Sequence, residues 1–141
     1  AINLAHAIGI KTPRAAILSA VESPNPGIPS SMEAREVADA EWSDAQVDGP
    51  FALDNAVNAR AAQLKGIESP VAGDADILVM PSIEAGNILF KGLVYMAEAE
   101  TAGLVVGAKA PVILTSRADS AEARIASCAL GVLYASQLKQ S

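Results

Sequence analysis

Short runs of apolar residues alternate along the chain with longer stretches in which apolar residues recur every three or four positions. The short runs are typical of buried strands, and the periodic stretches are typical of amphipathic helices. Strands are predicted over residues 14–21, 47–52, 75–80, 103–107 and 111–115. Helices are predicted over residues 2–8, 32–42, 55–64, 88–99 and 119–138. This alternation predicts an α/β domain of three α/β/α layers around a mainly parallel sheet.

Four of these segments carry more specific expectations. Residues 75–80 contain four consecutive large apolar residues and form the clearest buried strand, while 112–115 predicts a short buried strand that runs into a polar turn. Residues 103–107 and 111–115 are separated by a joint too short for a helical crossover, which predicts an antiparallel hairpin. On the closing helix, the residues expected to face inward are Ile125, Cys128, Ala129, Val132 and Leu133.

Composition and charge narrow the class of protein. The chain has 141 residues, which suits one domain with a real core, and a net charge of −6 with ten basic residues that form no cluster. An acidic chain of this kind argues against a nucleic-acid surface. The single cysteine, Cys128, rules out an intrachain disulfide, and no apolar run has the length of a membrane span. We therefore expect a cytoplasmic protein.

The start of the chain suggests a piece of a longer protein. The sequence opens without an initiator Met and enters directly into an apolar periodic pattern. We expect the missing part to lie upstream.

Candidate chemistry concentrates in the turn after residues 112–115, where four polar side chains lie within five residues: Ser116, Arg117, Asp119 and Ser120. A strand that enters a helix through such a turn presents free backbone N–H groups and the positive end of the helix dipole, which suits an anion. Arg117 can bind a phosphate there through its planar fork of donors. The same spacing fits a capping box, so a well-capped helix without a ligand is the alternative interpretation.

The sequence predicts no metal site. His6 has no Cys, His or carboxylate neighbour at ligand spacing, and Asp39, Asp44 and Asp48 are scattered. A lone histidine of this kind is more often structural or exposed than a ligand.

Four segments together resemble the phosphate acetyltransferase/phosphate butyryltransferase family: VDGPFALDNAV (47–57), ADILVMPSIEAGNILFKGLVY (75–95), GLVVGAKAPVILTSRADSAEAR (103–124) and, more weakly, SAVESPNPGIPSSMEA (19–34). They match the C-terminal half of a family member and lean to the butyryltransferase-like branch, which includes the C-terminal portions of fused enoyl-CoA hydratase/phosphate acetyltransferase proteins. The resemblance implies a fold like that of isocitrate and isopropylmalate dehydrogenases, incomplete at the N-terminus. Residues 1–115 would then form most of the central α/β domain, and the helix in 116–141 would return to the first domain.

The resemblance also implies an activity, the reversible transfer of a short acyl group between CoA and inorganic phosphate. Family members are typically homodimers that use CoA as a substrate and need no redox cofactor. By resemblance, Ser116 hydrogen-bonds the thiol or the oxyanion, and Arg117 binds phosphate and the carbonyl oxygen. Gly86 and Asn87 are expected to line the same pocket through a bare backbone and an amide.

The general base is less clear from the resemblance. In the acetyltransferase branch the proposed base is an aspartate seven residues after the serine, where this chain has Ala123. We prefer Glu122 as the base over Asp119, which suits a cap. Because a further family arginine would lie upstream, the fragment alone is expected to be inactive. The alternatives are a metal-dependent decarboxylating dehydrogenase on the same fold and a non-catalytic folding or dimerisation module.

Overall fold

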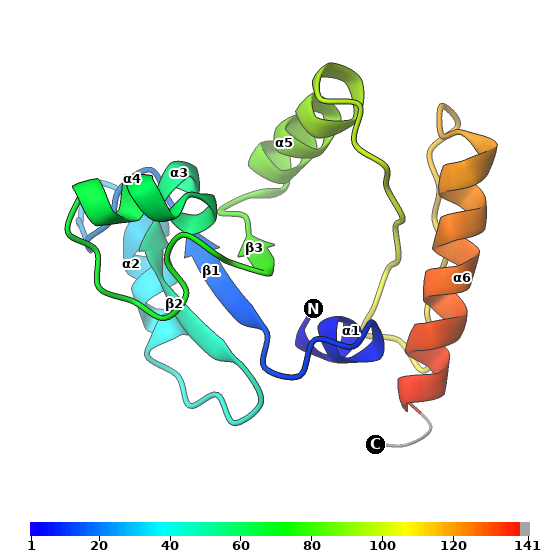
Figure 1. Cartoon of the computed structure of the whole chain (residues 1–141), viewed down its shortest axis with the longest axis horizontal. Coiled ribbons are helices and arrows are strands. Elements are labelled where there is room, and N and C mark those ends of the chain that lie inside the picture. Colours follow the sequence, from blue (N-terminus) through cyan, green and yellow to red (C-terminus); the bar gives the residue numbers. More distant parts are fainter. Residues whose placement is uncertain (139–141) are drawn as a thin grey trace. The chain divides into compact units, whose positions relative to one another are not determined.

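The computed structural model describes residues 1–138 and shows helices alternating with the strands of a small parallel sheet (Figure 1). The elements in chain order are α1 (Ile2–Ala7), β1 (Arg14–Leu18), α2 (Pro29–Ala38), β2 (Gln46–Phe51), α3 (Leu53–Val57), α4 (Ala59–Leu64), β3 (Ile77–Val79), α5 (Ile83–Met96) and α6 (Ala121–Leu138). The predicted α/β class with a parallel sheet is confirmed. The likeness to the dehydrogenases stays a prediction.

The described chain divides into two compact units. The sheet unit consists of Ile2 and Thr12–Asn87, and the helical unit consists of Ala1, Asn3–Lys11 and the described residues from Ile88 onward. Helix α5 therefore begins in the sheet unit and continues into the helical unit. The division predicted at residue 115 concerns a longer two-domain protein and stays a prediction.

In the sheet unit, β1 is the central strand of the order β2-β1-β3, and both of its pairings are parallel. Parallel neighbours need a crossover, which α2 supplies between β1 and β2. The chain then passes through α3 and α4 to β3 on the other side of β1. Ala15–Leu18 are all buried because β1 is covered on both faces.

The core of the sheet unit lies on one face of β1. Ala16 and Leu18 point to that face, since side chains alternate along a strand, and they pack with Phe51, Ala56 and Val71. Helix α2 contacts β1 and β2 and buries small side chains.

A close approach of two strands requires Gly49. A Cβ on this residue would lie 2.6 Å from the carbonyl oxygen of Ile17 and 2.9 Å from its Cβ. Any side chain at position 49 would therefore push β2 away from β1.

The helical unit is built on α6. Ser127 Oγ accepts a hydrogen bond from the Gly103 N–H at 3.0 Å, and Tyr134 is buried. A Cβ on Gly131 would lie 3.2 Å from Ile113 Cδ1. The small residues on this face let the segment that contains Leu104 and Ile113 pack closely against the helix.

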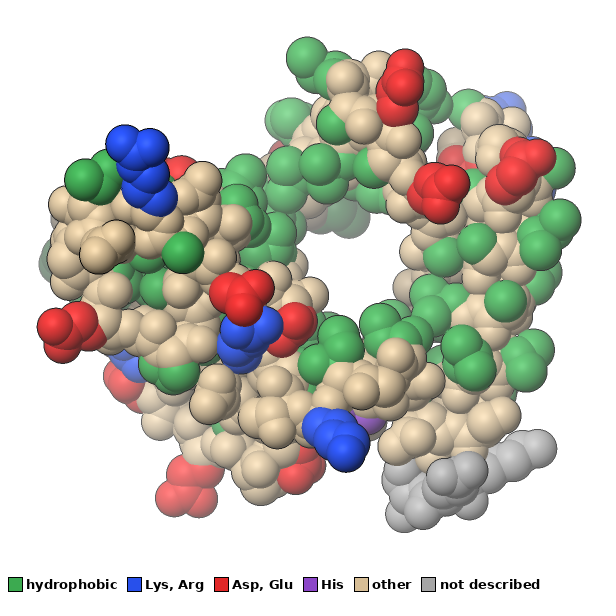
Figure 2. Space-filling model, in the orientation of Figure 1, with side chains coloured by type: hydrophobic (Ala, Val, Ile, Leu, Met, Phe, Trp, Pro, Cys, Tyr) green, Lys and Arg blue, Asp and Glu red, His purple; other side chains and the backbone are tan. Residues whose placement is uncertain are grey.

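The face of α6 predicted to point inward is exposed. Ile125 and Val132 keep 69% and 68% of their surface, and Cys128 is exposed as well. The buried positions are Ser127, Gly131 and Tyr134 on the opposite side of the helix. The prediction was wrong because the helix is apolar or small nearly all round, so its periodicity does not select a face. Figure 2 shows hydrophobic side chains projecting along α6.

The prediction of a buried strand at 112–115 was also wrong. The two segments of the expected hairpin form one antiparallel bridge, between Val105 and Val112, whose N–H···O distances are 2.8 and 3.0 Å. Val112, Ile113 and Leu114 are exposed, with Leu114 at 72%. The predicted antiparallel direction was correct. Within the described residues, however, these two segments form only this single bridge and no longer ladder of paired residues.

Smaller differences concern element boundaries. The strand predicted at 75–80 shortens to β3, and the prediction that it is buried was wrong. It lies at an edge of the sheet, where Ile77 and Leu78 are only partly buried and Val79 is exposed. The helix predicted at 55–64 is two helices, because Asn58 has an extended backbone and caps α4 by accepting the Ala61 N–H at 3.1 Å. Over residues 1–138, no helix combines the length and apolar character that crossing a bilayer requires.

Candidate functional site

The turn before α6 is held by its own polar side chains. Asp119 Oδ2 accepts the backbone N–H of Ser116 at 2.6 Å, and Ser116 Oγ accepts the N–H of Ala118 at 3.3 Å. Ser120 Oγ accepts the N–H of Ala123 at 3.2 Å and so caps the helix. Capping and turn formation therefore occupy Asp119 and Ser120. The Ser116 hydroxyl accepts one bond and keeps its own proton available for donation.

Arg117 lies at the centre of this turn. Its side chain is exposed and its guanidinium makes no ion pair with any residue of the described range 1–138. Its carbonyl oxygen accepts a bond from Arg124 Nη2 at 3.4 Å. The guanidinium is therefore available to an anion from outside the chain.

Glu122 lies on the first turn of α6, where the helix end affects its ionisation. Its own backbone N–H, followed by the Ser120 hydroxyl, hydrogen-bonds the carboxylate and lowers the pKa of Glu122 below its ordinary value. The carboxylate is ionised at neutral pH. It can accept a proton there, but the lowered pKa makes it a weak base.

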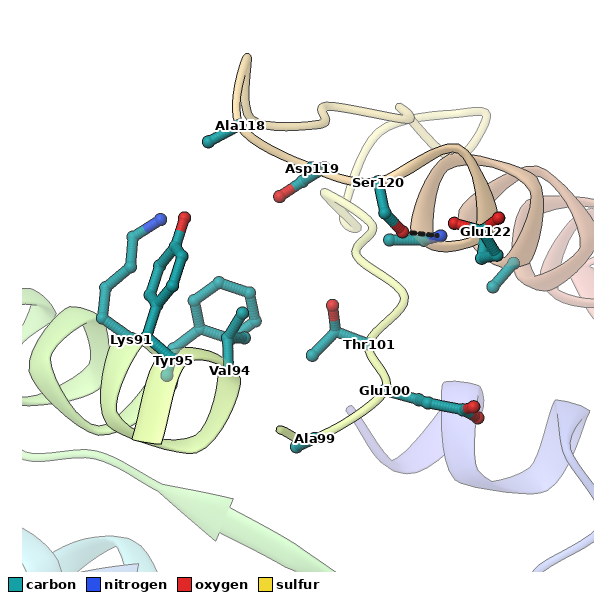
Figure 3. A pocket seen from close by; sticks show the side chains of 13 residues that line it. Lys91, Val94, Tyr95, Ala99, Glu100, Thr101, Ala118, Asp119, Ser120 and Glu122 are labelled. Carbon is teal, nitrogen blue, oxygen red and sulfur yellow. Dashed lines mark hydrogen bonds between the residues drawn. The ribbon is translucent and has the colours of Figure 1, made fainter. Parts of the chain in front are cut away.

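A pocket of about 470 Å³ opens in the helical unit between α5 and the start of α6 (Figure 3). From α5 it is lined by Phe90, Lys91 and Tyr95, and from the turn and α6 by Asp119 and Glu122, among others. Figure 3 shows the ends of Lys91 and Tyr95 directed toward the turn, with Asp119 directed back toward them. The volume is in the range of small-molecule sites.

Lys91 is a site residue that the sequence reasoning missed. Its ammonium lies 5.5 Å from the centroid of Phe90 and 5.6 Å from that of Tyr95, within the range of cation–π attraction. The i, i+4 spacing of Lys91 and Tyr95 on one helix was visible in the sequence and could have indicated their proximity.

The predicted site residues fall into three groups. Asp119 and Glu122 line the pocket, whereas Ser116 and Arg117 lie in the adjoining turn and do not line it. Gly86 and Asn87 lie in the early turns of α5 in the sheet unit. Their shared pocket with Arg117 and the catalytic roles of all six residues stay predictions.

A second polar cluster lies in the sheet unit after the carboxyl end of β1. Glu22 Oε1 accepts bonds from Asn55 Nδ2 at 2.7 Å and from Lys65 Nζ at 2.6 Å. These bonds, with that from Lys65 the stronger, lower the pKa of Glu22. Asn55 is fully buried, and its Oδ1 has no hydrogen-bond partner within the described part of the chain. Among residues 1–138, no group of three His, Cys, Asp or Glu side chains lies close enough to hold a metal ion.

The proteins similar to this chain are named as phosphate acetyltransferases or phosphate butyryltransferases. A phosphate acetyltransferase of Rhizobium meliloti is 50% identical over 97% of this chain and 45% of its own length. A probable phosphate butyryltransferase of Bacillus subtilis is also 50% identical, over 94% of this chain and 46% of its own length. The chain thus spans about half the length of the curated relatives it matches, and the two names match equally well, so the branch stays a prediction.

A solved structure agrees with these relatives. The branched-chain phosphotransacylase of Enterococcus faecalis matches with a TM-score of 0.87 and 41% identity, over 96% of this chain and 50% of that chain. The model of the phosphate acetyl/butaryl transferase family covers residues 1–132. The chain therefore belongs to the phosphate acetyl/butaryl transferase family.

Proposed function

We propose that this chain contributes the Ser116–Arg117 turn to an enzyme that reversibly transfers a short acyl group between CoA and inorganic phosphate. The observation that carries the proposal is the Ser116–Arg117 turn in a chain of this family. The exposed Arg117 guanidinium makes no ion pair with residues 1–138, and it lies beside the Ser116 hydroxyl, which is able to donate. The activity belongs to the longer protein, and the fragment alone is expected to be inactive.

The first requirement of the reaction is to bind phosphate. Inorganic phosphate carries between one and two negative charges at neutral pH and needs charged donors. The Arg117 guanidinium supplies a planar fork of donors at the positive end of α6. Asp119 supports this arrangement without occupying Arg117, because its carboxylate binds the Ser116 N–H.

The second requirement is to stabilise the tetrahedral intermediate. A phosphate oxygen attacks the thioester carbonyl, and the carbonyl oxygen becomes an oxyanion until the C–S bond breaks and CoA leaves as a thiolate. Hydrogen-bond donors that point at this charge lower the barrier. In the proposal the Ser116 hydroxyl donates to the oxyanion or to the departing sulfur, and Arg117 shares its charge with the carbonyl oxygen.

The third requirement is a proton acceptor for the reverse direction. The CoA thiol must lose its proton before it attacks an acyl phosphate. Glu122 stays our preferred base over Asp119, because the carboxylate of Asp119 already accepts the Ser116 N–H. Since the pKa of Glu122 is lowered, the acidic limb of the rate profile is expected below the ordinary glutamate pKa of about 4.3.

Replacement of Arg117 by alanine tests the proposal. In the full-length natural protein, Arg117→Ala should lower kcat/KM for phosphate more than tenfold, because a hydrogen bond to a charged group contributes about 1.5–3 kcal/mol. Thiol release from acetyl-, propionyl- and butyryl-CoA in the presence of phosphate measures it. Lys109→Ala is the matched control, because Lys109 is also exposed in the helical unit and makes no ion pair with the residues that the structure describes. A loss within twofold for Arg117→Ala would show that the site assignment is wrong.

The exposed side of α6 favours a second role, as a dimerisation surface. Ile125, Cys128, Val132 and Leu133 form one exposed apolar stripe at spacings of three, four, seven and eight residues. We propose a homodimer that covers this stripe, in the cytoplasm, where a lone thiol stays reduced. Val132→Glu should shift the protein to the monomer on a sizing column. Arg124→Glu, on the same helix outside the stripe, should leave the elution volume unchanged.

A further inference from the structure

We propose that Lys91 is a self-modification site, whose side-chain amine is acylated by the acyl phosphate that the enzyme makes. This inference rests on the proposed function for the identity of the acyl donor. It rests on the pocket between α5 and the start of α6 for the choice of this lysine. The proposed transfer reaction itself does not use the Lys91 side chain.

The position of Lys91 carries the first step of the argument. Lys91 lines the pocket from α5, while Asp119 and Glu122 line it from the turn and α6. Figure 3 shows the end of the Lys91 side chain directed toward the turn. In the proposed function the same turn holds phosphate on Arg117. An acyl phosphate bound there therefore lies next to a pocket that contains an amine.

The contacts of Lys91 carry the second step. Its nitrogen makes no ion pair with residues 1–138 and lies 5.5 Å and 5.6 Å from the ring centroids of Phe90 and Tyr95. The two rings keep the side chain beside the pocket, and no carboxylate of the described chain holds it as an ammonium. Lys65 shows the contrast, because Glu22 accepts a hydrogen bond from its Nζ at 2.6 Å and raises the pKa of Lys65. A lysine attacks a carbonyl only as the neutral amine, so Lys65 is the less reactive of the two.

The walls of the pocket carry the third step, because they suit the modified side chain. Val94, Ala99 and Ala126 add apolar surface to the lining. A short acyl chain on Lys91 would contact this surface and leave water, which is favourable. Acylation would also replace the ammonium by a neutral amide. Carboxylates would then be the only charged groups among the described residues that line the pocket.

The chemical step balances without a further reagent. The neutral amine of Lys91 attacks the carbonyl carbon of the acyl phosphate, and a C–N bond forms. The tetrahedral intermediate collapses when the bond between the acyl carbon and the phosphate oxygen breaks. Inorganic phosphate leaves with the electron pair and takes up the proton that the nitrogen loses. The products are an amide on Lys91 and inorganic phosphate.

Peptide mass spectrometry tests the proposal on the full-length natural protein. The protein is incubated with synthetic butyryl phosphate without CoA, and the initial rates of acylation at Lys91 and Lys109 are compared. Lys109 is the matched control, because it is exposed in the helical unit and makes no ion pair with the described residues. Lys91 should react at least about tenfold faster, because a donor bound beside it raises the effective concentration. Equal rates would overturn the proposal, since any exposed lysine reacts slowly with an acyl phosphate.

Two further measurements identify the donor and the cause of the preference. Acyl-CoA also carries an activated acyl group, so the rates are repeated with butyryl-CoA in phosphate-free buffer. Acylation of Lys91 should be slower than with butyryl phosphate, and an equal or faster rate would overturn the choice of donor. In urea the preference for Lys91 over Lys109 should disappear. A preference that survives unfolding would show that the local sequence, and not the pocket, selects Lys91.

Substitutions locate the modification by a second route. In intact-mass spectra the first acyl adduct should disappear in Lys91→Arg, because a guanidinium stays protonated and does not attack. The adduct should persist in Lys109→Arg. The opposite pattern, with the adduct kept in Lys91→Arg, would overturn the proposal.

Failure of this proposal and failure of the proposed function give different results. The labelling uses a synthetic acyl phosphate and needs no turnover by the enzyme. Preferential labelling of Lys91 in a protein that does not transfer acyl groups from CoA to phosphate would refute the proposed function alone. Normal acyl transfer with equal labelling of Lys91 and Lys109 would refute this proposal alone.

Discussion

The sheet unit and the helical unit differ most in how they bury apolar side chains. Of the apolar residues buried within the described part of the chain, only Ala5 and Tyr134 belong to the helical unit. The sheet unit contains the whole cluster around Leu18, Phe51 and Val71. Burial of such side chains is the main favourable term in folding, so the sheet unit contains most of the stability that this chain can generate by itself.

The two units also differ in whether their basic side chains form ion pairs. In the sheet unit, Arg14, Arg35 and Lys65 each pair with two carboxylates. In the helical unit, Lys91 and Arg117 make no ion pair with residues 1–138. The comparison teaches that the groups available to a ligand are concentrated where the chain is least committed to its own packing, as is common for binding elements.

Truncation of the core should produce the largest difference between the units. Phe51→Ala should lower the free energy of unfolding by about 3–5 kcal/mol, because it removes a buried ring and leaves a cavity. Leu133→Ala in the helical unit should change it by about 0.5 kcal/mol or less, since Leu133 is exposed. Chemical denaturation of the monomeric chain measures both. Similar losses for the two variants would contradict the contrast in packing.

Removal of the α6 cap should have an intermediate effect, confined to the helical unit. Ser120→Ala removes the acceptor of the Ala123 N–H and should cost about 1 kcal/mol of helix stability. Hydrogen exchange of the first turn of α6 measures the loss locally. Ser136→Ala is the control, because Ser136 is exposed and donates back to the Val132 carbonyl within the same helix. Equal exchange in the two variants would show that the cap contributes nothing.

The smallest expected effect is the pH-dependent loss of the stability that the Arg14–Asp76 ion pair contributes to the sheet unit. The Arg14 guanidinium, followed by the Arg14 backbone N–H, lowers the pKa of Asp76. A carboxylate with a lowered folded-state pKa stabilises the fold above its unfolded pKa, and this stabilisation is lost as the pH falls through the folded value. Asp76→Asn should therefore cost about 1 kcal/mol or less at pH 7, since the pair is partly exposed.

Urea titrations at several pH values measure this effect. The difference between wild type and Asp76→Asn should disappear in acid. Glu36→Gln, which alters an exposed carboxylate on α2 that has no ion pair among residues 1–138, should show no such dependence. A difference that persists in acid would show that Asp76 acts through packing rather than charge.

The sequence by itself determined the alternation of strands and helices, the parallel sheet around residues 14–18 and the polar turn at 116–120. These are local properties: apolar runs, helical periodicity and turn chemistry act over a few residues. It also indicated the family through its motifs. The choice of Ser116 and Arg117 as site residues rests on that resemblance and awaits the Arg117→Ala test.

Only the tertiary structure decided which face of α6 is buried, that β3 lies at an edge, and that Lys91 and Tyr95 share a pocket with Asp119. Each of these depends on contacts between residues far apart in the chain. On α6 the decisive residues are small: Gly131 permits close approach to Ile113, a packing preference that an Ala-rich, nearly uniform helix does not express in its periodicity.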